Sequence, residues 1–141
     1  MKLLVATDGS KNSLRAVSYA ADLLGKLGGA GSMTLISVHD DAALRHARRF
    51  VGKQAIDDYL HELSDADLAE ARALLDKASV KYDSVVRTGH IASEIAEAGE
   101  AGHYDLIILG SKGRSALKDL LIGSVAKRVA EIARTPVLLV R

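Results

Sequence analysis

Three glycines stand between a strand-length apolar run and a helical pattern in residues 106–129, LIILGSKGRSALKDLLIGSVAKRV. Gly110 ends the apolar run, Gly113 follows closely, and Gly123 precedes Ser124 at the start of the helical pattern. Glycine lets a ligand approach the backbone, such turns can point N–H groups at an anion, and a helix N-terminus favours phosphate. The Ser124 hydroxyl can donate to a phosphate oxygen or bind a metal ion on it. The segment predicts a phosphate site, with a plain glycine turn and helix cap as the alternative.

Charged residues near these loops have two interpretations each. Lys112, Arg114 and Lys118 lie among the glycines, where they either contact phosphates or face water. Asp8 follows the first apolar run and either contacts the ligand or caps the first helix or its turn. The loop around Asp8, TDGS, lacks the G-x-G-x-x-G fingerprint, and the chain has no G-x-x-x-x-G-K-[ST] motif. We therefore expect neither a nicotinamide or flavin site nor a P-loop.

The elements that must position these residues alternate along the chain. Helical spacing of apolar residues marks 13–27, 64–78, 91–101 and 124–133, and strand-length runs mark 2–6, 33–38, 82–88, 105–109 and 137–140. Most of the runs are unbroken apolar stretches, as expected for strands covered by helices on both faces. The pattern predicts an α/β fold with an open, parallel, doubly wound sheet and right-handed crossovers. In such sheets ligands bind beyond the carboxyl ends of the strands, where the strand order reverses.

Composition narrows the classes of protein. A chain of 141 residues predicts one domain, 1–141, and the formal net charge of +1 gives no electrostatic case for nucleic acid. The chain lacks cysteine, which excludes disulfides and cysteine-ligated metals. No apolar run approaches the length of a membrane span, and the N-terminal run is too short for a signal-peptide core. We expect a cytoplasmic protein without membrane insertion.

The segment from Asp40 to Leu63 has the weakest pattern. It is polar and only partly periodic, which predicts a mobile loop and a helix start, with Ser64 as the N-cap of the next helix. The residues expected to pack down are Ile56, Tyr59, Leu60 and Leu63. His39 precedes two aspartates, but a lone histidine at a strand end is more often structural than a metal ligand. The basic run RHARRFVGK, residues 45–53, favours a solvated face over a phosphate or partner contact.

The spacing G-x2-G-x9-G-S and its flank GRSALKDLLIGSVAKRVA closely resemble the nucleotide-binding branch of the universal stress protein family. The opening VATDGSKNSLRAVSYAA and the closing ARTPVLLV resemble the same family. The resemblance implies a Rossmann-like five-stranded sheet of order 3-2-1-4-5 with helices on both faces. It also implies ATP as the ligand, with Mg or Mn. The glycines and Ser124 match positions that hold ribose and phosphates, Asp8 matches an acidic residue near the nucleoside and metal, and the backbone of Val38 matches the adenine contact. The expected nucleotide site is Asp8, Val38, Gly110, Gly113, Arg114, Gly123, Ser124 and Val125.

The leading functional hypothesis is a regulatory ATP-binding protein whose nucleotide state alters conformation, assembly or the binding of an unidentified protein partner. No nucleophile–base pair stands out in the sequence, so a slow ATPase or nucleotide-transferring enzyme is the alternative. A protein-interaction module without nucleotide is the second alternative. With the strand order above, the apolar run 137–140 lies at a sheet edge, which predicts antiparallel pairing with a second copy and a homodimer.

Overall fold

The apolar runs form one parallel sheet. The computed structural model describes residues 1–113 and 121–141, so Arg114 and Lys118 lie outside the described residues. The strands are β1 (Lys2–Ala6), β2 (Ser32–Asp40), β3 (Asp83–Gly89), β4 (Leu106–Gly110) and β5 (Val137–Val140). Their order is β3-β2-β1-β4-β5, and each adjacent pair is parallel. The predicted doubly wound sheet of order 3-2-1-4-5 is confirmed.

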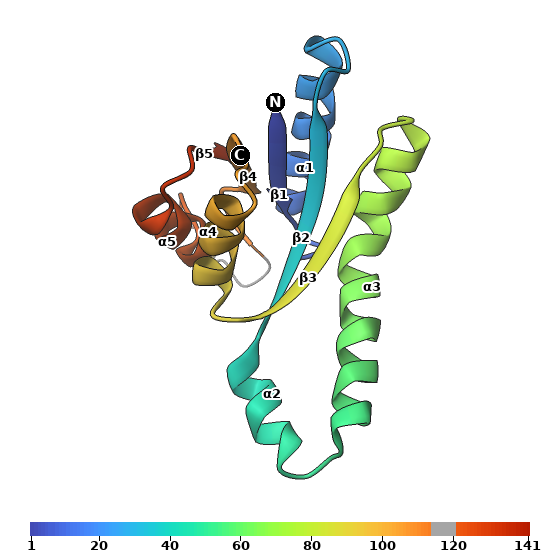
Figure 1. Cartoon of the computed structure of the whole chain (residues 1–141), viewed down its shortest axis with the longest axis vertical. Coiled ribbons are helices and arrows are strands. Elements are labelled where there is room, and N and C mark those ends of the chain that lie inside the picture. Colours follow the sequence, from blue (N-terminus) through green and yellow to red (C-terminus); the bar gives the residue numbers. More distant parts are fainter. Residues whose placement is uncertain (114–120) are drawn as a thin grey trace.

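Helices cover both faces of the sheet (Figure 1). The helices are α1 (Lys11–Lys26), α2 (Asp41–Arg48), α3 (Lys53–Lys77), α4 (Ile91–Ala101) and α5 (Ser124–Ile132). Side chains alternate between the two faces of β1: Leu3 and Val5 are buried with residues of α1 and α3, and Leu4 is buried with residues of α4 and α5. Two apolar cores therefore hold the carboxyl ends of the strands in fixed positions.

The strand order reverses between β1 and β4. In the register, Ala6 of β1 lies opposite Ile36 of β2, while Val5 lies opposite Ile108 of β4. β1 and β4 are neighbours, and their chains leave toward opposite faces, β1 into α1 and β4 toward α5. This reversal creates the crevice in which open α/β sheets bind ligands.

Of the mobile loop and the helix start predicted between Asp40 and Leu63, the helix start is confirmed, but most of the segment before it is also helical. The segment forms α2 and the first turns of α3, which extend past the carboxyl ends of the strands (Figure 1). Ser64 is not an N-cap: it is buried inside α3, where its hydroxyl donates to the Leu60 carbonyl oxygen at 2.7 Å. That bond to the preceding turn lets a serine sit within a helix. Gly52 is the N-cap residue of α3.

The packing predicted for this segment holds only in part. Ile56 is buried, and Leu60 and Leu63 are half-buried. Tyr59, by contrast, is 52% exposed. The outer face of α3 is wide and polar. Only the positions that face the protein show the apolar spacing from which a helix is predicted.

Candidate functional site

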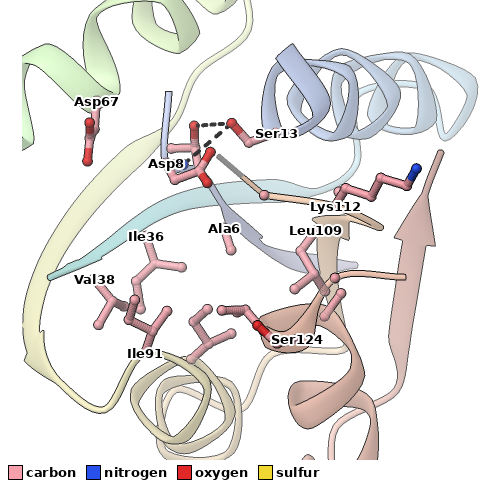
Figure 2. A pocket seen from close by; sticks show the side chains of 17 residues that line it. Ala6, Asp8, Ser13, Ile36, Val38, Asp67, Ile91, Leu109, Lys112 and Ser124 are labelled. Atoms are coloured by element: carbon pink, nitrogen blue, oxygen red, sulfur yellow. Dashed lines mark hydrogen bonds between the residues drawn. The ribbon is translucent and has the colours of Figure 1, made fainter. Parts of the chain in front are cut away.

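A pocket of about 280 Å³ opens at the carboxyl ends of the strands, at the reversal of strand order. Residues from the β1–α1 loop, β2, α3, α4, β4 and α5 line it (Figure 2). The predicted site residues among them are Asp8, Val38, Gly110, Gly113, Gly123, Ser124 and Val125. The structure thus brings together seven residues spread over most of the chain; the eighth, Arg114, lies outside the described residues.

The β1–α1 loop holds its shape through side-chain hydrogen bonds. Asp8 Oδ1 accepts from the Ser10 backbone N–H at 2.9 Å, and Ser10 Oγ accepts from the Ser13 N–H at 3.2 Å as the N-cap of α1. The buried hydroxyls of Thr7 and Ser13 lie 3.1 Å apart (Figure 2 shows Ser13 beside Asp8). The interpretation of Asp8 as a residue that fixes the turn is confirmed. Its side chain also lines the pocket, and its contact with a ligand stays a prediction.

Gly110 is required by packing within the protein. A Cβ at this position would lie 2.8 Å from the backbone carbonyl carbon and oxygen of Asn12, in the first turn of α1. Real Cβ atoms essentially never come that close to backbone, so a side chain here would push α1 away from β4. The glycine therefore brings the start of α1, and with it the Asp8 loop, close to the end of β4.

Gly123 joins the N-terminus of α5 to the loop after β4. Its N–H donates to the Ser111 carbonyl oxygen at 2.6 Å, and an added Cβ would lie 3.2 Å from Lys112 Cα and 3.4 Å from Gly113 N. The glycine pattern predicts room for a phosphate, but a side chain at Gly123 would first meet protein backbone. A Cβ at Gly113 would lie 3.1 Å from Asp8 Oδ2, so this glycine lets the two loops meet.

The N-terminus of α5 forms one wall of the pocket. The first bond of this helix runs from the Lys127 N–H to the Gly123 carbonyl oxygen, at 3.0 Å. The N–H groups of Ser124, Val125 and Ala126 precede that bond and have no acceptor within the helix. All three residues line the pocket. Together with the positive end of the helix dipole, they make this wall suited to an anion.

Much of the remaining lining is apolar. Its apolar residues are Ala6, Ile36, Val38, Ile91, Ile95 and Leu109. Figure 2 shows Ile36, Val38 and Ile91 grouped together, away from Lys112. A pocket with an apolar wall on one side and anion-binding groups on the other suits a ligand with a flat apolar ring and a negative tail.

Sequence reasoning missed several lining residues, among them Thr7, Ser13, Asp67 and Ile91. Ser13 lies one turn inside α1, so only the N-cap pattern at Ser10 hints at its inward position. Asp67 comes from α3, whose first turns fall in the segment predicted to hold a mobile loop and a helix start. Ile91 begins α4, and its half-buried side chain packs against the apolar core and also lines the pocket.

His39 bridges β2 and α3. Its Nε2 lies 3.0 Å from Ser64 Oγ and 3.4 Å from Ser37 Oγ. Across residues 1–113 and 121–141, no group of three or more His, Cys, Asp or Glu side chains is arranged to hold a metal ion. In the basic run, Arg45 forms an ion pair with Asp41 at 2.7 Å, and Arg48, Arg49 and Lys53 are exposed. No helix in the described part of the chain is long and apolar enough to cross a membrane.

Comparison with known proteins identifies the family. All of residues 1–141 match the model of the universal stress protein family. The chain belongs to this family. The universal stress protein MJ0531 of Methanocaldococcus jannaschii is 32% identical over 146 residues, which cover 99% of this chain and 81% of that protein.

Solved universal stress proteins share the fold. The structure of MJ0577 from Methanocaldococcus jannaschii has a TM-score of 0.83 with 27% identity, covering 99% of this chain and 94% of that one. A universal stress protein in complex with cAMP has a TM-score of 0.74 with 23% identity, covering 100% of this chain and 97% of that one. The predicted membership of the universal stress protein family is confirmed.

Proposed function

We propose that this universal stress protein binds ATP in the pocket between β1, β4 and α5, and that the bound nucleotide controls its conformation, assembly or partner binding. The observation that carries the proposal is the division of the pocket: an apolar wall from β2 and α4 faces the open N-terminus of α5. A family member in complex with cAMP supports an adenine nucleotide as the class of ligand.

In the proposed arrangement the adenine ring packs against Ile36, Val38 and Ile91, near the backbone of Val38. The ribose lies near Asp8 and Gly110, at the centre of the pocket. The phosphates extend toward Gly113, Ser124 and the N–H groups of the first turn of α5. The volume of about 280 Å³ is at the lower end of the roughly 300–1,000 Å³ range of small-molecule sites. It suits the nucleoside, with the phosphates reaching the open side.

A divalent cation fits this arrangement as a companion of the nucleotide. Mg²⁺ commonly binds through one or two protein oxygens together with substrate phosphates, and needs no cage of protein ligands. Asp8 and the Ser124 hydroxyl are the oxygen donors that line the pocket near the proposed phosphate path. Bound there, Mg or Mn would neutralise phosphate charge.

The edge strand β5 is proposed to form a homodimer with its own copy. The carbonyl oxygen of Pro136 accepts a hydrogen bond from the backbone N–H of Ile107, and that of Val140 accepts one from Ser111. Because residues alternate along a strand, the N–H and C=O groups of Val137 and Leu139 point away from β4, toward the sheet edge. Antiparallel pairing about a twofold axis would satisfy these groups.

Native mass spectrometry of the purified protein tests both parts of the proposal. The expected spectrum contains a dimer that gains the mass of ATP and a divalent cation when Mg-ATP is added. Single-turnover analysis of the same complex measures hydrolysis and decides between a regulator and a slow ATPase. A protein that takes up no adenine nucleotide at millimolar concentration would favour the nucleotide-free interaction module.

A further inference from the structure

Asp67 reaches the pocket from a helix that sequence analysis had not connected with the site. It lies on α3, half-buried, and lines the pocket together with residues of the opposite sheet face. Its position is fixed on both sides along the helix. One turn before it, Ser64 Oγ lies 3.0 Å from His39 Nε2 of β2, and the next residue, Leu68, is fully buried.

The groups that line the pocket differ from one side to the other. Figure 2 shows Asp67 at one side of the pocket and Lys112 at the other, with Asp8 between them. The N-terminus of α5 contributes its positive dipole at the end opposite Asp67. The N-terminus of α5 favours a polyanionic tail, and the apolar side chains of Ile36 and Val38 favour the base. In the proposed arrangement the base is therefore the part of the nucleotide nearest Asp67.

A carboxylate accepts hydrogen bonds and donates none, so it fits a base that presents an N–H group to it. Adenine carries an exocyclic amino group, whereas hypoxanthine has a carbonyl oxygen at the same position and would place lone pairs against the carboxylate. We infer that Asp67 accepts a hydrogen bond from the exocyclic amino group of the bound base and so selects adenine over bases with a carbonyl there. This inference rests on the proposed function.

The test compares the affinities of three triphosphates for three proteins. ATP, inosine triphosphate and 2′-deoxy-ATP are titrated calorimetrically, with Mg²⁺, into the wild type, Asp67→Asn and Glu70→Gln. Glu70 is an exposed residue of the same helix outside the pocket, so its substitution removes the same charge as a matched control. The wild type is expected to prefer ATP over inosine triphosphate by at least about tenfold, since an unmet hydrogen bond to a charged group is costly.

Asp67→Asn is expected to reduce this preference at least about tenfold, because the amide N–H can donate to the carbonyl oxygen of hypoxanthine. The affinity of 2′-deoxy-ATP relative to ATP should be the same in all three proteins. Glu70→Gln should keep the wild-type preference for ATP over inosine triphosphate. An unchanged preference in an Asp67→Asn protein that binds ATP overturns the inference alone. The inference is also overturned if Asp67→Asn changes the affinity of 2′-deoxy-ATP relative to ATP and leaves that of inosine triphosphate relative to ATP unchanged. Asp67 would then contact the ribose. Failure of the wild type to bind ATP overturns the proposed function and this inference with it.

Discussion

Replacing Gly110 by alanine is expected to destabilise the fold at the base of the pocket. The added Cβ would lie 2.8 Å from two backbone atoms of Asn12, which cannot rotate away as a flexible side chain does. The first turn of α1 must then move, although Ala16 and Val17 of the same helix are fully buried against the sheet. Overpacking of this kind costs about 1–3 kcal/mol. The melting temperature should fall by roughly 4 °C for each kcal/mol lost.

Gly25→Ala is the matched control for this change. Gly25 lies in α1, the helix that a side chain at position 110 would meet, and a Cβ at Gly25 would meet nothing within 4 Å. Alanine is the better helix former, so this variant should gain up to about 1 kcal/mol. Guanidinium unfolding followed by circular dichroism compares the two midpoints at constant slope. If Gly110→Ala unfolds at the wild-type midpoint or above, the close approach of α1 to β4 is not what requires the glycine.

Three further predictions address the phosphate end, the sheet edge and the anchor of α3. Ser124→Ala should weaken Mg-ATP binding by about 1 to 2 kcal/mol, roughly 5- to 30-fold, because one hydrogen bond to a charged oxygen is lost. The circular dichroism spectrum should stay the same, and an unchanged affinity would place the phosphates elsewhere. Leu139→Pro should give a folded monomer by light scattering, since its N–H points away from β4; a stable dimer would exclude β5 as the interface. Ser64→Ala should lower the free energy of unfolding by about 1 kcal/mol, because His39 loses its nearer hydroxyl partner; a midpoint equal to the wild type in urea would contradict this.

The sheet was predictable because its signal is local. Strands covered on both faces must be apolar throughout, so runs such as KLLVA and DLIIL stand out in the sequence. The strand order came from the family resemblance, since apolar runs alone do not say which strands are neighbours. The beginning of α3 escaped prediction because few of its positions face the protein and a serine stands in its middle.

The candidate site was predictable only where glycines and a helix start mark it. Gly113, Gly123 and Ser124 form a recognisable segment, and the structure places them around one pocket. Asp67 has no such signal, because it reaches the pocket only through the way α3 packs on β2. The reason for Gly110 was equally hidden: the contact with Asn12 joins residues that are far apart in the sequence.

An adenine nucleotide bound in this pocket is expected to place its phosphates at the N-terminus of α5. The most direct measurement is a titration of isotope-labelled protein with Mg-ATP, followed through the backbone amide resonances. The largest changes are expected at the N–H groups of Ser124, Val125 and Ala126, with smaller changes at Val38. Amides of Gly28 and Gly29, in the loop after α1, should stay unchanged. Saturable binding that leaves the α5 amides unshifted, or no binding at millimolar ATP, would contradict it.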